Sequence, residues 1–180
     1  MNHEPKHEKK CSEFSSWILC ILIALIVGLL LRVFVVEFVN VSGNSMQPGL
    51  HPEQVVLVEK VSKRFVTPDY EDVVIVKFSN VDKRYYVKRV IGKEGDTIEV
   101  RDGKVIRNGE TLDEPYILED YIVDPMAPVT VPEGHIFVMG DNRNNSTDSR
   151  SSQVGAIAKK DIVGKGICVI FPLNEIQSVK

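Results

Sequence analysis

Hydrophobic residues are divided unevenly along this chain of 180 residues. From residue 14 to residue 39, 21 of 26 positions are apolar, whereas only 55 of the 141 positions from residue 40 onward are apolar. Residues 14–31 carry no charge, and a helix of that length spans about 27 Å, close to the hydrocarbon thickness of about 30 Å. Near one end of this stretch, the long side chain of Arg32 can extend its charge to the membrane–water interface. Near the other end lies Trp17, a residue type that is enriched at this interface. The pattern predicts a membrane-spanning anchor at residues 14–36, preceded by a tail at residues 1–13.

The remainder, residues 37–180, has the pattern of a β domain. From residue 40 onward it holds 22 Val and 12 Ile against 5 Leu and 3 Ala, and β-branched residues favour strands. No long stretch repeats its apolar residues with the helical period. Short apolar runs predict strands at residues 55–58, 73–78, 85–91, 136–139 and 167–171. We therefore expect a mainly β fold, in which one transmembrane helix is followed by an all-β domain.

Turn signals divide the middle of this domain. Asp102-Gly103 and Asn108-Gly109 are residue pairs that two-residue type I′ hairpins prefer, so residues 97–112 are predicted to form a small meander. Residues 115–132 contain four prolines and are expected to form a long loop. A short helix at residues 153–158 is also considered.

Charge predicts the orientation of the chain and excludes one class of function. The net charge is −3 and no basic cluster stands out, so the chain is not expected to bind nucleic acid. Three lysines precede the anchor, and after Arg32 the next basic residue is Lys60. The positive-inside rule therefore keeps residues 1–13 in the cytoplasm and places residues 37–180 outside it.

The apolar segment has a second interpretation, a secretory signal peptide that is cleaved off. Small residues at 41–43 loosely fit a cleavage pattern, but they lie well beyond Leu31, and the nearer residues are bulky. An uncleaved anchor is therefore favoured, which predicts a single-pass protein of the cell membrane. On this topology Cys168 is the only exported cysteine, so a disulfide within the domain is not expected. The Cys and His spacings do not indicate a metal site.

Two side chains are candidates for nucleophilic chemistry. Ser45 lies where an apolar stretch runs into a turn of Gly, Asn and Pro residues; it is either an ordinary turn serine or an exposed nucleophile. A nucleophilic serine needs a base, and His51 and His135 lie in predicted loops without a carboxylate to orient them. Lys88 shares a strand face with largely apolar neighbours, so it is either a solvated lysine or a buried one. To act as a base near neutral pH, its pKa of about 10.4 must fall by about 3 units, which burial can supply.

The segment 140–150 is a third polar feature. It is dense in Asn, Asp, Ser and Arg and directly follows an apolar run, as an ordinary surface loop also would. Asp148 and Arg150 can form a structural ion pair there, and the hydroxyl groups can orient an amine. Overlapping Asn-x-Ser/Thr sequons at Asn144 and Asn145 are interpreted as coincidental.

Together these segments resemble the type I (leader) signal peptidases, in particular their Gram-positive branch. The likeness rests on four boxes in order behind the anchor: Gly-Asn-Ser-Met-Gln-Pro at 43–48, Asp-Val-Val-Ile-Val at 72–76, Tyr-Val-Lys-Arg-Val-Ile-Gly at 86–92 and the polar segment at 140–150. The resemblance implies a coiled, barrel-like antiparallel sheet with a hairpin and loop insertion at residues 93–134. It also implies a membrane-bound Ser–Lys serine endopeptidase that cleaves signal peptides from exported preproteins, with no cofactor and no metal ion.

The resemblance assigns roles to individual residues. Ser45 would be the nucleophile, with its backbone N–H as one oxyanion donor, and Lys88 would be the general base. Ser146 would orient the Lys88 amine. Structural support of the site would come from Asp141, Asn142, Arg143, Asp148 and Arg150. Some family members have a serine at the position of Gly43 that supplies the second oxyanion donor, so here that donor is not identified; Gly49 stands where a threonine is common.

Substrate is expected to bind along two extended segments, because an extended peptide can add to a sheet edge. The residues concerned are Phe38, Val39, Asn40, Val41, Ser42, Gly43, Asn44, Tyr85, Tyr86 and Val87. The expected partners are the signal peptides of secretory preproteins, the lipid bilayer and, by proximity, the export translocase. Two alternatives stay open: a Ser–Lys protease dedicated to one substrate, such as a surface-fibre subunit, and a non-catalytic, membrane-tethered β module that binds exported chains.

Overall fold

The computed structural model of the protein describes residues 7–62, 65–82 and 84–179, with side chains described from residue 14 onward. The chain divides into two compact units, and the boundary lies between Val36 and Glu37. Within the tail predicted at residues 1–13, residues 1–6 lie outside the described part of the chain.

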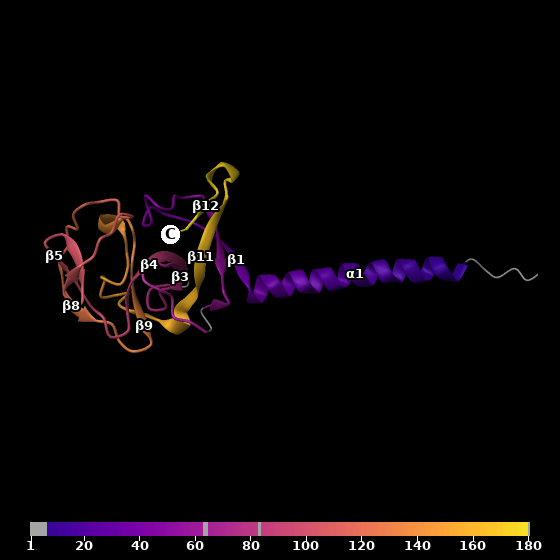
Figure 1. The fold of residues 1–180 in the computed structure, drawn as a ribbon, viewed down its shortest axis with the longest axis horizontal. Coiled ribbons are helices and arrows are strands. Elements are labelled where there is room, and N and C mark those ends of the chain that lie inside the picture. Colours follow the sequence, from indigo (N-terminus) through magenta and orange to yellow (C-terminus); the bar gives the residue numbers. More distant parts are fainter. Residues whose placement is uncertain (1–6, 63–64, 83, 180) are drawn as a thin grey trace, which may run out of the picture. The chain divides into compact units, whose positions relative to one another are not determined.

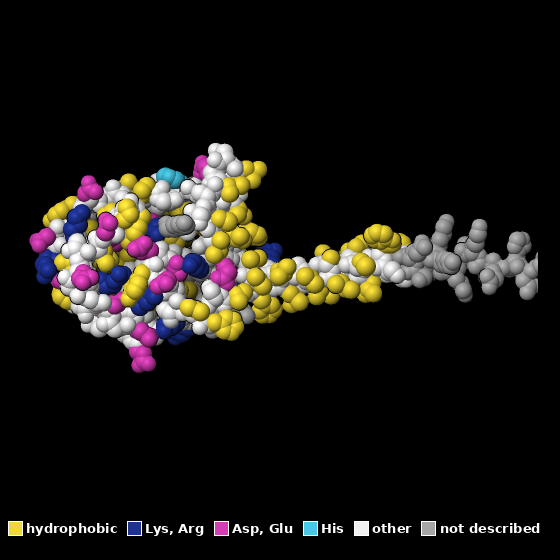
Figure 2. Space-filling view, in the orientation of Figure 1, with side chains coloured by type: hydrophobic (Ala, Val, Ile, Leu, Met, Phe, Trp, Pro, Cys, Tyr) yellow, Lys and Arg dark blue, Asp and Glu magenta, His cyan; other side chains and the backbone are white. Residues whose placement is uncertain are grey.

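The first unit contains one long apolar helix, α1 (His7–Phe34). Its stretch Phe14–Phe34 comprises 21 residues with a mean hydropathy of 2.8, none of it buried, which is long and apolar enough to cross a membrane. Figure 2 shows hydrophobic side chains along the visible side of this helix. The helix ends at Phe34 and Val36 already belongs to a strand, so the last two residues of the predicted anchor are not helical.

The second unit is built on an eight-stranded sheet. Its order is β1-β2-β11-β3-β4-β9-β10, with β12 paired to β11, and the described strand registers are all antiparallel. The predicted mainly β fold, a curled antiparallel sheet that follows one apolar helix, is therefore confirmed (Figure 1). The strands are β1 (Val36–Asn40), β2 (Val55–Glu59), β3 (Val73–Lys77), β4 (Tyr85–Lys93), β9 (His135–Met139), β10 (Ile157–Ala158), β11 (Ile162–Phe171) and β12 (Gln177–Ser178).

The five strands predicted from apolar runs are present. The one predicted at residues 167–171 begins earlier, at Ile162, because β11 continues across Gly164 and Gly166. The short helix considered at residues 153–158 does not form; turns lead there directly into β10. Short 3-10 helices connect the strands: η2 (Arg143–Asn145), η3 (Lys159–Asp161) and η4 (Leu173–Glu175).

A separate four-stranded sheet of order β7-β6-β5-β8 forms the predicted insertion. Its strands are β5 (Thr97–Arg101), β6 (Lys104–Arg107), β7 (Glu110–Thr111) and β8 (Met126–Thr130), and in Figure 1 it lies at the end of the second unit away from β1. The predicted meander is confirmed. Asp102 and Gly103 have φ values of 52° and 75°, and Asn108 and Gly109 have values of 54° and 87°, as type I′ turns require.

The prediction of one long loop at residues 115–132 is wrong in part, because β8 lies inside it and pairs with β5. Pro128 falls within this strand. A proline is tolerated there because β8 is at the edge of its sheet, where a backbone N–H is not needed for pairing.

Buried apolar side chains on both faces of β3 hold the second unit together. Val73 and Ile75 pack with the residues of β2 and β11, whereas Val74 and Val76 pack against the other face with Val90. A third cluster joins the insertion to β4 and β9 through Ile91, Ile98, Val105, Phe137 and Met139. The middle of β4, which carries Lys88, therefore lies between packed layers.

Candidate active site

Ser45 and Lys88, which are 43 positions apart in the sequence, meet in the second unit. Ser45 lies in the turn that follows β1, and Lys88 lies in the middle of β4. The Lys88 Nζ donates a hydrogen bond of 2.7 Å to the Ser45 Oγ. Lys88 is only 1% exposed, so the structure selects the buried lysine over the solvated one.

Burial changes the acidity of the Lys88 amine. It lowers the pKa of Lys88 to about 8; the nearby Asp148 and Asp141 act in the opposite direction, and Arg150 adds to the lowering. With that pKa, about a tenth of the amine is neutral at pH 7. A neutral amine at this distance can accept the proton of the serine hydroxyl, which is the property that a general base needs.

Asp148 is the carboxylate that organises the loop 140–150. It accepts a hydrogen bond of 3.0 Å from the backbone N–H of Gly140 and two from the Arg150 guanidinium, at 2.8 and 2.9 Å. Burial by itself raises the pKa of Asp148, but the Arg150 contacts, with the Gly140 N–H and the Ser146 hydroxyl, outweigh it and hold that pKa below its usual value. The ion pair expected from the sequence is therefore present, and Arg150 also donates to the Arg143 carbonyl.

The same loop contacts the backbone of Ser45. The N–H of Asn142 donates a hydrogen bond of 3.0 Å to the Ser45 carbonyl oxygen. Gly140 lies so close that a Cβ on it would overlap the Ser45 carbonyl oxygen and the Ser146 hydroxyl. The backbone of the serine turn is therefore held by residues more than 90 positions later in the chain.

Arg89 and Asp141, which adjoin Lys88 and Asn142 in the chain, form a buried ion pair. Arg89 binds Asp141 through two hydrogen bonds of 2.8 and 2.6 Å, with side-chain exposures of 2% and 0%. Arg89 also donates to the Glu71 carbonyl at 2.9 Å. Burial raises the pKa of Asp141, and the charge and hydrogen bonds of Arg89 act against that rise. Because Arg89 follows Lys88 and Asp141 precedes Asn142, this pair joins the strand that carries Lys88 to the loop that contacts Ser45.

Ser146 does not make the contact that the sequence predicted. Its Oγ is buried and acts on the carboxylate of Asp148, whose pKa it helps to lower, whereas the Lys88 amine bonds to Ser45. The hydroxyl is directed against Gly140. In this structure the Lys88 amine is therefore oriented by Ser45 and by its buried surroundings.

The two predicted substrate segments differ from expectation in their extent. The strand before Ser45 ends at Asn40; Val41 still bonds to the backbone of Glu53 and Gln54, and Gly43 turns the chain with a φ of 88°. Residues 42–44 are therefore not strand. The reason is that the chain must turn there to bring Ser45 to β4, and glycine adopts this φ without strain.

In β4, the residues before Lys88 are used in different ways. Tyr85 is exposed, but Val87 is buried in the core beside β3. Tyr86 stacks on Phe78 with ring centroids 4.1 Å apart and donates to Asp82. β9 pairs with β4 only from Arg89 onward among the described registers, so the β4 segment ahead of Arg89 has a backbone edge that β9 does not cover.

Sequence reasoning missed the residues that surround the loop 140–150 from the insertion. Glu114 binds Arg143 with two hydrogen bonds of 2.7 Å, and the ring of Tyr116 lies 4.0 Å from the Arg89 guanidinium. The only signal in the sequence was indirect: Arg89 and Arg143 lie next to apolar strands, and buried arginines need acidic partners.

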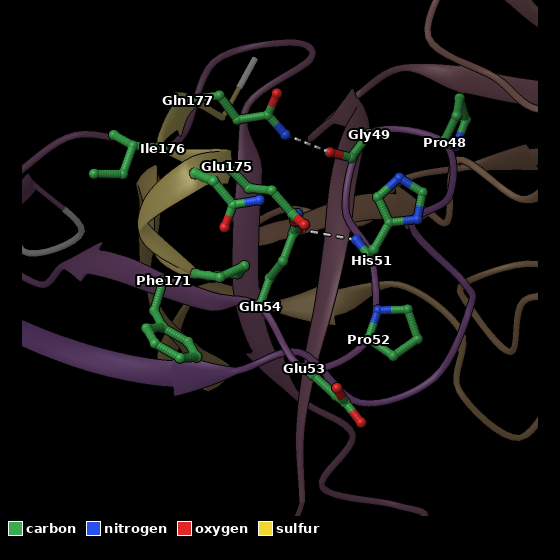
Figure 3. A pocket seen from close by; sticks show the side chains of 12 residues that line it. Pro48, Gly49, His51, Pro52, Glu53, Gln54, Phe171, Glu175, Ile176 and Gln177 are labelled. Atoms are coloured by element: carbon green, nitrogen blue, oxygen red, sulfur yellow. Dashed lines mark hydrogen bonds between the residues drawn. The ribbon is translucent and has the colours of Figure 1, made fainter.

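A cavity of about 820 Å³ lies apart from Ser45 and Lys88. It is lined by residues 48, 49 and 51–54, which follow Ser45, and by the turn between β11 and β12. Figure 3 shows Gln177 reaching toward Gly49 and the backbone of His51 reaching toward Gln54. Neither Ser45 nor Lys88 lines it.

Comparison with known proteins gives consistent matches. Residues 14–171 match the family described as "Signal peptidase, peptidase S26". Signal peptidase I S of Bacillus subtilis (strain 168) is 39% identical over 171 residues, which cover 89% of this chain and 91% of that protein. Signal peptidase I P of Bacillus subtilis subsp. natto is 40% identical over 185 residues, covering 97% of this chain and 98% of that protein. A crystal structure of a signal peptidase I from Enterococcus faecalis V583 matches with a TM-score of 0.48 and 29% identity, over 56% of this chain and 97% of that one.

Proposed function

Because the chain belongs to the signal peptidase I family, peptidase S26, and is therefore a serine peptidase, we propose that it cleaves N-terminal signal peptides from exported preproteins through a Ser45–Lys88 dyad. Membership in this family confirms the resemblance predicted from the four sequence boxes. The observation that carries the proposed mechanism is the 2.7 Å hydrogen bond between Ser45 and a lysine that is almost fully buried.

In the first half of the reaction, the neutral Lys88 amine takes the proton of the Ser45 hydroxyl as the Oγ attacks the carbonyl carbon of the scissile bond. The resulting tetrahedral intermediate carries a negative oxygen. When this intermediate collapses, the Lys88 ammonium gives its proton to the leaving amine, the C–N bond breaks and the mature protein departs. The signal peptide remains bound to Ser45 as an ester.

In the second half, the neutral Lys88 amine takes a proton from water, and the hydroxide attacks the ester. Collapse of this second tetrahedral intermediate breaks the bond to the Ser45 Oγ, which recovers its proton from Lys88. The signal peptide is released with a new carboxylate. The backbone N–H of Ser45 would stabilise the negative oxygen in both halves; Gly43 has no side chain to add a second donor.

The substrate would bind as an added strand next to Lys88. The β4 segment ahead of Arg89 has a backbone edge that β9 leaves uncovered among the described registers, and β1 is the last strand at its end of the sheet. An extended cleavage region between them would present alternate side chains to the sheet. Shallow surroundings of Val and Tyr residues favour small side chains such as Ala at the positions before the cut.

The helix α1 would anchor the enzyme in the cell membrane as a single pass, with residues 1–13 in the cytoplasm and residues 37–180 outside it. The uncharged stretch and the three preceding lysines support this topology. A signal peptide ends its own apolar segment at the same membrane surface, close to the export translocase. The anchor would therefore raise the effective concentration of substrate at Ser45.

The purified full-length chain in lipid vesicles is expected to cleave a panel of unrelated preproteins. N-terminal sequencing of the products should place each cut at the junction between signal peptide and mature protein, after a small residue. Cleavage of one preprotein alone would instead support a dedicated protease. Tight binding of these preproteins without turnover would support a non-catalytic module and contradict the proposed function.

The plot of kcat/KM against pH is expected to show an ascending limb whose midpoint lies near pH 8. The neutral form of Lys88 is the active one and its pKa is about 8, so kcat/KM is low below this pH and levels off above it. The measurement is kcat/KM against pH for one preprotein, with Ser45→Ala as the blank at each pH. A limb near pH 10 would mean that the base is a solvated lysine, contrary to the proposal.

A further inference from the structure

The insertion sends one segment, residues 114–123, back to the loop that supports the dyad; we name this segment the clasp. Its first contact is an ion pair between Glu114 and Arg143 with side-chain exposures of 5% and 0%. Both guanidinium nitrogens donate to the carboxylate at 2.7 Å, the two-pronged geometry that makes such pairs strong and directional.

Tyr116 is the second contact of the clasp. Its ring centroid lies 4.0 Å from the Arg89 guanidinium carbon and 6.0 Å from that of Arg143, so the ring faces two buried cations. Its hydroxyl donates a hydrogen bond of 3.0 Å to Glu114. Burial, with Glu114 beside it, raises the pKa of Tyr116, so the phenol keeps the proton that it donates.

Backbone hydrogen bonds complete the clasp. The N–H of Leu118 donates to the Asp141 carbonyl at 3.1 Å, and the N–H of Arg143 donates to Glu119 at 2.9 Å. Asn144 bonds to the backbone at both Tyr121 and Val123, each at 2.9 Å. The residues from Asp141 to Asn144 are thus held by the clasp on one side, while the Asn142 N–H holds Ser45 on the other.

We propose that Glu114 and Tyr116 are positioning residues for the Ser45–Lys88 dyad, acting through Arg89, Arg143 and the loop that they hold. The inference rests on the proposed function of that dyad. Neither residue is expected to touch substrate, because the clasp belongs to the insertion and not to β1 or β4. They act through two sets of contacts. The clasp holds Asp141 and Arg143, and Asn142 between them bonds to the Ser45 carbonyl. Tyr116 also packs on Arg89, which is the chain neighbour of Lys88.

The clasp is also expected to influence the pKa of Lys88, because it holds the loop that surrounds this side chain. The amine bonds to Ser45, and the charged groups that act on its pKa are Asp148, Arg150 and Asp141, all of which belong to the loop 140–150. If the clasp is loosened, this loop moves away from β4 and water reaches Lys88. The pKa of Lys88 then rises toward that of a solvated lysine, because desolvation is the main cause of its lowering.

The test compares Tyr116→Leu with Tyr116→Phe in the full-length protein in lipid vesicles. For Tyr116→Leu we expect kcat to fall by about ten- to a hundredfold, as small misplacements of catalytic groups do, with KM changed less than about twofold. The pH limb should move upward by about half a unit or more. Tyr116→Phe keeps the ring face over Arg89 and should retain most of the wild-type kcat and its limb.

Two further variants keep the test decisive if Tyr116→Leu fails to fold. Glu114→Gln preserves shape but weakens the pair with Arg143, and it should shift the limb in the same direction. Glu110→Gln, on the exposed strand β7 of the same insertion, should behave as wild type. Folding is followed by the midpoint of the thermal transition in the tyrosine near-ultraviolet circular dichroism and not by its amplitude, because all five tyrosines lie in the second unit and the Tyr116 variants keep four of them.

One result would overturn the inference: Tyr116→Leu and Glu114→Gln fold with the wild-type pH limb and lose activity only in proportion to the unfolded fraction. The clasp would then act on stability alone. The wild-type protein and Ser45→Ala are assayed beside them, so that this failure is distinct from failure of the dyad itself. In that second case, the wild-type protein would show no Ser45-dependent cleavage.

Discussion

Lys88→Met is expected to lower kcat/KM for preprotein cleavage by at least about 10⁴-fold, in the range found when one member of a catalytic unit is removed. Methionine has a similar length and suits a buried position, but it has no amine to take the Ser45 proton. Near neutral pH the serine hydroxyl would then have to lose its proton to water. The measurement is single-turnover cleavage of one preprotein by equal amounts of each protein in vesicles.

Three companions make this result interpretable. Ser45→Ala should cost a similar factor, and the double variant should cost little more than either single one, because the two groups act as one unit. Lys93→Met, a lysine on the same strand that pairs with Asp69 near the surface, should keep wild-type activity. Substantial turnover by Lys88→Met with an unshifted fold would show that another group serves as the base.

Arg89→Met is expected to destabilise the second unit by about 3–5 kcal/mol, because it leaves Asp141 as a buried charge without its partner. The carboxylate is fully buried and accepts both of the short hydrogen bonds that Arg89 donates. Arg89 also carries the stacking contact of Tyr116. Thermal unfolding of the full chain in detergent, followed by the tyrosine signal, should show a Tm lower by about 10 °C or more.

The matched controls separate the ion pair from general damage. Arg101→Met removes an arginine that is 62% exposed and contacts Glu99 at 3.4 Å, and its cost should be below about 1 kcal/mol. Arg89→Met/Asp141→Asn removes both charges and should recover part of the lost stability, since no unpaired ion remains. If the single variant melts like Arg101→Met, the buried pair contributes little and Asp141 is neutral in the folded protein.

Local features were predictable because neighbouring residues produce them. The strands β2, β3, β4 and β9 follow from short Val- and Ile-rich runs. The hairpins follow from Asp102-Gly103 and Asn108-Gly109, because these pairs adopt positive φ at little cost. The burial of Lys88 was not settled in this way, because its apolar neighbours on one strand face allowed a buried lysine and a solvated one alike, and only the structure shows it 1% exposed.

Other features depended on which distant segments meet. Glu114 reaches Arg143 across 29 positions, and no periodicity links a residue in a proline-rich stretch to a loop that far away. Strand β8 was hidden by Pro128 within it, which is tolerated because the strand lies at a sheet edge. Ser146 was expected at the Lys88 amine, but its hydroxyl lies against Gly140, and the amine bonds to Ser45.

The sequence by itself determined that the chain has an apolar helix and a β domain, and which serine and lysine to examine. Apolar periodicity, turn residues and short motifs carry that information within a few neighbouring positions. Only the tertiary structure decided that Ser45 and Lys88 lie within a hydrogen bond, that Arg89 pairs with Asp141, and that the clasp holds the loop beside them. The physical reason is that a buried charge must find its partner wherever the fold brings one, and that choice is made by the packing of segments far apart in the chain.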